Sequence, residues 1–176
     1  MVHTFENLIR QEIKHVKRGK KGHIILKMNG LQDPYLVSKL YEASEAGVKI
    51  DLIVRGICIL IPNQPYSKNI RVIRIVDRFL EHARVFVFHN NGDNNTYLGS
   101  ADWMKRNLYR RIECNFPIYD PDLKQEIRDI LEIQLKDNVK ASQINEKLEN
   151  VRVRNKKTQI RSQIATYEYF KNKYKE

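Results

Sequence analysis

Cysteine is nearly absent from this sequence, and the two cysteines that occur form no metal-binding pattern. Cys58 and Cys114 lie far apart in apolar segments, with no CxxC or cysteine-histidine spacing. Structural zinc sites are built from closely spaced ligands of these types, so this class of site is excluded. We therefore expect two reduced, buried thiols in a cytoplasmic protein.

Long apolar runs and glycine-rich loops are also missing. The longest apolar run, residues 57–62, is far shorter than the roughly 20 residues that a membrane-spanning helix needs. A signal peptide is excluded because His3, Glu6 and Arg10 interrupt the segment that would have to be apolar. The glycines form neither GxxxxGKS/T nor GxGxxG, which excludes a P-loop and a Rossmann dinucleotide motif.

Positive charge is what the sequence has in excess. Its 176 residues include 32 lysines and arginines against 21 acidic residues, a formal net charge of +11. A chain of this size buries roughly 70% of the surface that its unfolded form exposes, so it supports a core without a disulfide or a metal. We expect one soluble domain that attracts an anion: a nucleic acid, a phosphate polymer, a nucleotide or an acidic lipid.

The N-terminal half predicts alternating helices and strands. A 3.6-residue apolar period after Thr4 predicts a helix that this threonine caps and that Gly19 ends. Residues 23–28 and 49–54 are apolar runs typical of strands, and Asp33 caps a helix between them. A strand, a helix and a second strand form a βαβ unit, so we expect parallel strands and an α/β fold.

The following segments predict further elements of the same fold. Their apolar patterns predict strands at 70–75, 85–88, 96–98 and 110–118, a helical turn at 76–82 and a helix at 121–135. The asparagine-rich segment between the second and third of these strands predicts a hairpin.

The C-terminal segment differs in character from the rest. Residues 138–160 are polar and weakly periodic, whereas 162–174 predict a helix that turns Ile164, Tyr167 and Phe170 inward. We divide the chain into an α/β domain at 1–137 and an extension at 138–176 whose final helix packs on that domain.

Two basic residues stand where ligands bind in open α/β sheets, at the ends of strands. Arg55 ends the strand 49–54 and precedes Gly56, so its guanidinium is a candidate bidentate phosphate contact; pairing with a nearby acid is an equal alternative. His82 lies just before the strand 85–88, between arginines. It could act as a neutral base or donate to a phosphate as imidazolium.

A third cluster, residues 99–107, follows the strand 96–98. Its small residues allow close approach to a ligand, and Ser100, Asp102, Trp103 and Arg106 are candidates to line a cleft. Asp102 could orient a histidine, or it could cap a short helix. We expect no metal ligand in this chain.

The sequence resembles a known family over nearly its whole length. The matching segments are DLIVRGICIL, NIRVIRIVDRFLEHARVFVF and YLGSADWMKRNLYRRIE, and the match continues to RSQIATYEYF near the end. In this order and spacing they resemble the C-terminal catalytic domain of bacterial polyphosphate kinase, which makes long-chain polyphosphate. That resemblance implies a phospholipase D-like fold, a mixed sheet flanked by helices.

The resemblance implies phosphoryl transfer from ATP. In the family, the arginine that contacts nucleotide phosphates falls on Arg55, and a histidine implicated in catalysis and ATP binding falls on His82. The phosphorylated histidine and the Mg²⁺ ligands belong to the preceding domain, which this chain does not resemble. We expect an excised domain, inactive alone, whose partners are ATP or ADP, polyphosphate and the preceding domains; a homo-oligomer is left open. One departure is Arg74, where the family has a small residue.

Two other functions remain as alternatives. The basic ends, with Arg152, Arg154, Lys156, Lys157 and Arg161 in the second, suit a polyphosphate track but also a non-enzymatic nucleic-acid-binding module. That module should expose aromatic residues, whereas the tyrosines here fall largely at core spacing. A phospholipase D-type nuclease is the other alternative, because residues 82–84 and 99–100 faintly echo the HxK and GSxN motifs of that superfamily.

Overall fold

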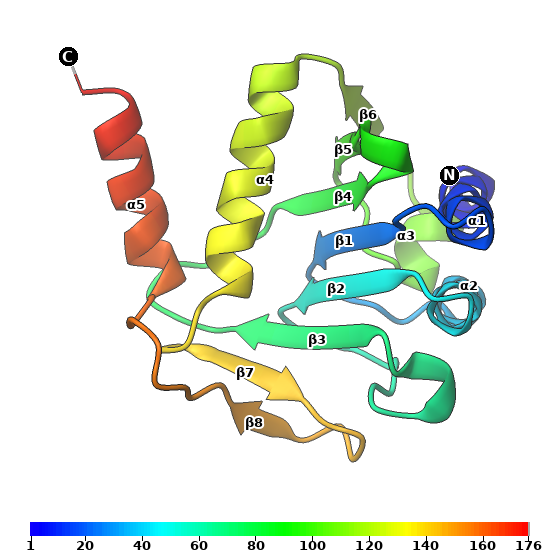
Figure 1. The fold of residues 1–176 in the computed structure, drawn as a ribbon, viewed down its shortest axis with the longest axis horizontal. Helices are drawn as coiled ribbons and strands as arrows, with labels where there is room; N and C mark the ends of the chain where they lie inside the picture. Colours follow the sequence, from blue (N-terminus) through cyan, green and yellow to red (C-terminus); the bar gives the residue numbers. More distant parts are fainter. Residues whose placement is uncertain (176) are drawn as a thin grey trace.

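The fold is one mixed β-sheet between two helical layers. The computed structural model describes residues 1–175, and in this part of the chain the strands form a single eight-stranded sheet in the order β6-β5-β4-β1-β2-β3-β7-β8. Figure 1 shows helices α1 and α2 on one face of the sheet and α4, with α5 beside it, on the other. The predicted α/β class is confirmed.

Three parallel strands form the middle of the sheet. They are β1 (His23–Met28), β2 (Lys49–Val54) and β3 (Ile70–Ile75). Helix α2 (Pro34–Glu45) connects the first two, and the Asp33 side chain accepts a hydrogen bond from the amide of Leu36. The predicted βαβ unit and its aspartate cap are therefore confirmed.

Antiparallel strands extend the sheet on both sides. They are β4 (Arg84–Phe88), β5 (Asn95–Gly99) and β6 (Asn115–Ile118) on one side, and β7 (Ala141–Ile144) and β8 (Asn150–Arg152) on the other. Short 3₁₀ turns lie at η1 (Pro65–Ser67) and η2 (Asn90–Gly92). Because β7 pairs with β3, part of the segment beyond residue 137 belongs to the sheet itself.

The central strands are buried on both faces, and each face has its own apolar core. Ile24 of β1 lies in the core under α1 (Val2–Lys17) and α2, whereas its neighbour Ile25 lies in a second core with Leu131 of α4 (Pro121–Leu135). Successive side chains of a strand point to opposite faces, so one apolar run serves both cores. The remaining helices are α3 (Lys105–Arg110) and α5 (Ser162–Lys173).

Three local predictions are wrong. Helix α1 begins at Val2 with Met1 as its N-cap, so Thr4 lies in the first turn and caps nothing. Residues 76–82 form no helical turn, because long-range polar contacts hold them as an irregular loop. The expected strand at 110–118 is shorter than predicted. Only Asn115–Ile118 forms a strand, β6, and residue 110 ends α3.

Some side chains also lie elsewhere than predicted. Ile164 and Tyr167 of α5 are exposed, while Ser162 and Gln163 at its start are buried. The periodicity of an amphipathic helix does not reveal that the first turn of α5 binds Asp137 and Phe79 and that the rest of the helix lies beside α4. Cys114 is exposed on the segment before β6, whereas Cys58 is partly buried and burial raises the pKa of its thiol.

Candidate functional site

Arg55 lies at the carboxyl end of β2, as predicted. Its Nε donates to Asn29 Oδ1 over 2.7 Å, and Asn29 itself follows directly after β1. The amide of Gly56 donates to the Asn29 carbonyl at 2.8 Å, so the ends of these two parallel strands are joined. Arg55 and Arg106 line an open pocket of about 390 Å³ beside this junction. Two guanidinium groups on one pocket suit an anionic ligand.

Arg74 strengthens the same strand end. Its guanidinium donates to the carbonyl of Gly56 and, at 2.9 Å, to Asn150 Oδ1. The large residue at this position therefore supports the backbone next to Arg55, and its charge does not stand free beside the pocket.

His82 is exposed on the loop between β3 and β4. The Arg84 guanidinium lies 2.9 Å from the ring nitrogen Nδ1 and 3.1 Å from Nε2, and it also donates to the His82 carbonyl over 2.8 Å. Arginine has no acceptor, so the nitrogen with which it forms a hydrogen bond is the unprotonated one. Arg84 thus fixes both the ring and the backbone of His82, and both ring nitrogens lie against its guanidinium.

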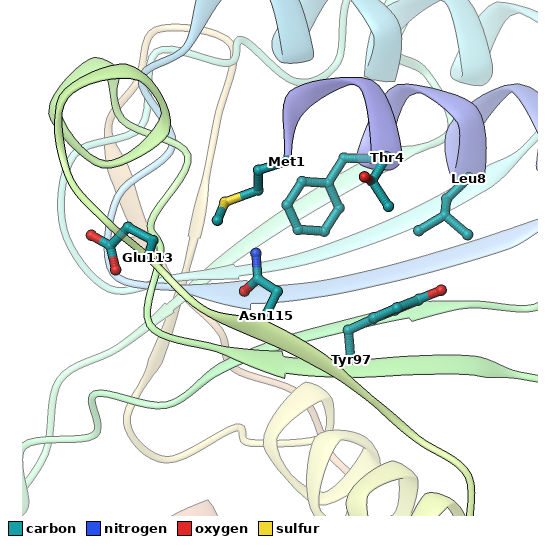
Figure 2. A pocket seen from close by; sticks show the side chains of 7 residues that line it. Met1, Thr4, Leu8, Tyr97, Glu113 and Asn115 are labelled. Atoms are coloured by element: carbon teal, nitrogen blue, oxygen red, sulfur yellow. The ribbon is translucent and has the colours of Figure 1, made fainter.

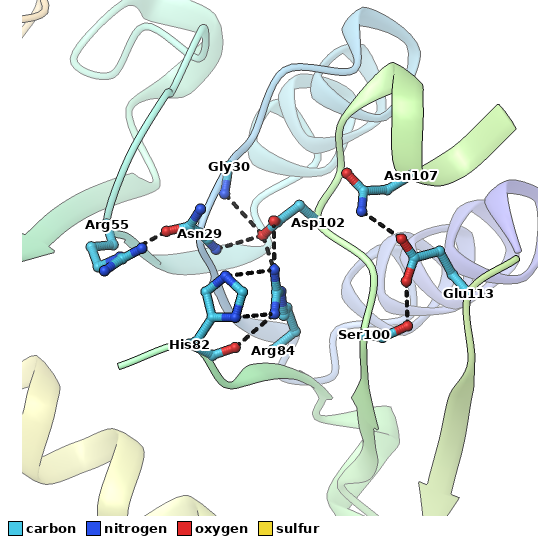
Figure 3. A network of polar contacts seen from close by, with 9 residues as sticks. All are labelled: Asn29, Gly30, Arg55, His82, Arg84, Ser100, Asp102, Asn107 and Glu113. Carbon is cyan, nitrogen blue, oxygen red and sulfur yellow. Dashed lines mark hydrogen bonds and ion pairs between the residues drawn. The ribbon is translucent and has the colours of Figure 1, made fainter. Parts of the chain in front are cut away.

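Asp102 joins the two basic residues. Its Oδ2 accepts from Arg84 over 2.8 Å, while its Oδ1 accepts from the backbone amides of Asn29 at 2.6 Å and Gly30 at 3.0 Å. A continuous path of contacts therefore runs from Arg55 through Asn29, Asp102 and Arg84 to His82 (Figure 3). Direct orientation of the histidine by Asp102 would need a contact between the two side chains, and Asp102 makes none with His82. It orients the arginine that holds the histidine, and the short helix α3 has Met104 as its N-cap.

The Arg84–Asp102 ion pair is largely removed from water. Only 11% of the arginine side chain and 2% of the aspartate side chain are exposed. A buried pair adds little net stability compared with apolar residues, but losing one partner costs about 3–5 kcal/mol. Such a pair makes physical sense where it holds one geometry, and here that geometry includes His82.

Trp103 and Ser100, like His82 and Asp102, are not among the residues that line the pocket beside Arg55. Trp103 is fully buried in the core under α1, where its ring lies 5.1 Å from Phe5 and 6.0 Å from Phe86, so its prediction as a cleft residue is wrong. Ser100 donates to Glu113 instead (Figure 3), and this hydrogen bond lowers the pKa of the glutamate. Small size and polarity along the sequence did not show which side of the chain each residue faces.

A second pocket lies between α1 and the outer strands (Figure 2). It measures about 250 Å³, and Phe5, Leu8, Tyr97 and Asn115 are among its lining residues. Neither Arg55 nor His82 lines it. Its lining carries no cationic side chain, so it does not suit the phosphate chemistry of the first pocket.

The sequence did not predict Asn29 as part of the site, and Arg84 was noted as a neighbour of His82 and as an echo of a lysine motif. The rule that selected Arg55 applies equally to Asn29, since this asparagine ends the neighbouring parallel strand. A strand-end search over every predicted strand would have found it.

The described residues contain neither a potential metal cluster nor a membrane-spanning helix. Within residues 1–175, no three histidine, cysteine, aspartate or glutamate side chains converge to form a potential metal site. No helix in that range is both long and apolar enough to cross a bilayer.

Exposed tyrosines and a paired arginine both bear on the alternative of a nucleic-acid-binding module. The expectation that the tyrosines are mostly core residues is wrong. Six of the nine are exposed, namely Tyr35, Tyr66, Tyr109, Tyr119, Tyr167 and Tyr174. The basic C-terminal segment is also less free than its composition suggests, because Arg161 is paired with Asp77.

Comparisons with known proteins agree on one family. A family model described as "Polyphosphate kinase C-terminal domain 2" matches residues 1–163. A polyphosphate kinase of Yersinia pestis is 55% identical over 166 residues, 93% of this chain and 24% of that protein. One of Halalkalibacterium halodurans is 56% identical over 144 residues, 81% of this chain and 20% of that protein. The chain thus spans about a quarter or less of these relatives.

Solved structures agree with this result. The crystal structure of polyphosphate kinase from Porphyromonas gingivalis matches 98% of this chain and 27% of its own, with a TM-score of 0.97 and 56% identity. The phospholipase D family member Nuc from Salmonella typhimurium matches 76% of this chain and 88% of its own, with a TM-score of 0.55 at 13% identity. The second likeness shows the fold alone, which is the predicted phospholipase D-like one. The chain belongs to the family of polyphosphate kinase C-terminal domains.

Proposed function

We propose that this chain supplies phosphate contacts for a polyphosphate kinase, within a longer enzyme that transfers the terminal phosphate of ATP reversibly to polyphosphate. The observation that carries the proposal is the path of contacts that joins Arg55 and His82 through Asp102. It fixes a cation and an imidazole at neighbouring strand ends, as positioning of a phosphoryl group requires. By itself, the chain is expected not to turn over.

The proposed chemistry has two steps. A histidine outside this chain attacks the terminal phosphorus of ATP, so that a P–N bond forms, the bond to the β-phosphate oxygen breaks and ADP leaves. The phosphoryl group then passes to a terminal oxygen of polyphosphate, and the P–N bond breaks. Little covalent work remains for this domain, whose part is to offset negative charge and hold geometry.

Arg55, Arg106 and His82 each have a distinct part in this proposal. Arg55 binds phosphate oxygens as charge moves toward the leaving group, and Arg106 on the same pocket binds the anionic chain. His82 donates a ring N–H to the transferring phosphoryl group. Mg²⁺ would reduce the charge of the phosphates, and its protein ligands are expected in the preceding domain. ATP as substrate and two free cysteines also support a cytoplasmic location.

The direct test places this chain in a complete enzyme. The matching region of the Porphyromonas gingivalis kinase would be replaced by this chain, and polyphosphate formation from ATP would be measured together with the reverse reaction. Arg55→Ala and His82→Ala should each lower the rate about a hundred- to a thousandfold, as loss of one charge-stabilising donor does. Lys171→Gln, which removes an exposed charge from α5, serves as the matched control.

Two outcomes contradict the proposal. One is a folded chimera without activity when the inserted chain is unaltered. The other is normal polyphosphate synthesis by either variant, which would show that the replaced residue does not touch the reacting groups.

A binding measurement separates the alternatives. Filter binding of the chain to polyphosphate, to ATP and to single-stranded DNA at two salt concentrations should show the tightest binding to polyphosphate, weakening as salt rises. Tighter binding to DNA, lost when exposed tyrosines are replaced, would favour the nucleic-acid-binding module.

A further inference from the structure

The loop that carries His82 is not held by apolar packing. Residues 76–83 join β3 to β4 without regular structure, and Val76, Phe79 and Leu80 are all exposed. Behind the loop lies a pocket of about 370 Å³, which Phe79 and Glu81 line from the loop side and Phe170 from α5. Since apolar burial is the main source of local stability, this loop needs another means of holding its position.

An arginine of the C-terminal segment provides the first contact. Arg161 donates from two nitrogens to the two carboxylate oxygens of Asp77, over 2.8 and 2.7 Å. The aspartate side chain is 2% exposed, and the arginine holds the pKa of that carboxyl below its usual value. A bidentate pair of this kind fixes orientation as well as distance.

A glutamine two residues further along the chain provides the second contact. The Gln163 side chain accepts from the amide of Phe79 at 2.8 Å and donates to the carbonyl of the same residue at 2.7 Å. It also donates to Glu81 Oε1 over 3.1 Å. The buried glutamine thus pairs with the loop backbone much as a neighbouring strand would.

These two residues are themselves fixed to the sheet. The buried carboxylate of Asp137 accepts from the amide of Ser162 at 2.7 Å, and with its other oxygen from the amide of Ala141 at 3.0 Å. Ala141 begins β7, which pairs with β3. The start of α5 is therefore tied to a strand whose partner leads directly into the His82 loop.

Two further side chains contact the loop at Glu81, next to His82. The ammonium group of Lys27 on β1 contacts Glu81, and Gln134 Nε2 of α4 donates to the same carboxylate over 2.7 Å. Glu81 thus receives hydrogen bonds from β1, α4 and α5, directly beside the histidine.

We propose that Arg161 and Gln163 are positioning residues for phosphoryl transfer: they hold the loop in the place from which His82 reaches the transferring phosphate. This inference rests on the proposed function. It gives the segment after residue 137 a part in the reaction, and it takes Arg161 out of the polyanion track, because its guanidinium is already bound.

Kinetics in the chimeric enzyme test the inference. Arg161→Gln and Gln163→Ala should each lower kcat about ten- to a hundredfold, as small displacements of a reacting group do, with the KM for ATP changed far less. In the His82→Ala background the same two substitutions should have no further effect, because they act only through that histidine. The exchanged pair Asp77→Arg with Arg161→Asp should regain part of the lost kcat. Lys171→Gln on the same helix is the control.

Hydrogen exchange of the isolated chain gives a readout without activity. Arg161→Gln should speed exchange of the amides in 77–82, while those of β1 and β2 keep their protection. Loss of protection throughout the sheet, or unchanged exchange in the loop, overturns the proposal. So does an equal loss of kcat with and without His82. Full activity of His82→Ala would refute the proposed function instead, and the loop exchange would still decide whether the contacts hold the loop.

Discussion

Asp102→Asn is the substitution that most directly tests the buried network. The side chain keeps its shape, and its remaining oxygen can still accept from the amides of Asn29 and Gly30. The new amide nitrogen then faces the Arg84 guanidinium, so that donors oppose donors and the arginine loses its counter-charge.

The expected magnitude follows from the burial of the pair. Removing one partner of a buried ion pair costs about 3–5 kcal/mol. We take the lower end, about 3 kcal/mol, because the Arg84 side chain is 11% exposed and keeps its contacts with His82. For a domain of this size each kcal/mol lowers Tm by roughly 2–4 °C, so the midpoint should fall by about 6–12 °C.

Thermal unfolding and urea titration of the isolated chain measure this effect. The double variant Arg84→Met with Asp102→Asn should recover much of the loss, since no unpaired charge is then buried. The control is Glu132→Gln, which removes an exposed carboxylate paired with Arg128 and should cost less than about 1 kcal/mol. The reasoning is refuted if Asp102→Asn has the same Tm and urea midpoint as Glu132→Gln. It is also refuted if the stability losses of Arg84→Met and Asp102→Asn simply add in the double variant.

Three further predictions concern the rest of the chain. Burial raises the pKa of Asp137, but hydrogen bonds from Ser162 and from the start of β7 outweigh it and hold the pKa below its usual value. The pKa of Asp137 is lower in the folded state than the value of about 3.9 in the unfolded chain. The stability that this carboxylate contributes is therefore complete well above a pH of about 3.9 and is lost as the pH falls through the folded-state pKa. Asp137→Asn should flatten the fall of the urea midpoint at acid pH. In Gly56→Ala the new Cβ would lie 2.8 Å from the Asn29 carbonyl oxygen. The variant should therefore lose about 1–3 kcal/mol of unfolding free energy by calorimetry, and its kcat in the chimera should fall. Unchanged kinetics would exclude a role for this turn. Leu131→Ala should cost about 2–5 kcal/mol by urea titration, because this side chain is 1% exposed in the core under α4, and a smaller loss would mean that α4 adds little to the fold.

Some parts of the fold were predictable because local physics decides them. The strands β1 and β2 are continuous apolar runs, and between them Asp33 and Pro34 start a helix in the way that short-range hydrogen bonding favours. The parallel pairing then follows from the handedness and length of the connection. Residues 76–82 were mispredicted since their apolar spacing suits a helical turn, whereas partners more than 80 positions away hold the loop.

The sequence by itself determined the class of the fold, the family and the position of Arg55 at a strand end, because apolar period, cap residues and motif order are properties of neighbouring residues. Only the tertiary structure decided that Trp103 faces the core, that Asp102 binds Arg84 and that Arg161 reaches Asp77. Those pairings join residues from separate elements, and their geometry depends on how the sheet brings the elements together. A charge of +11 predicts an anionic ligand, but which cations remain free to bind it depends on these contacts.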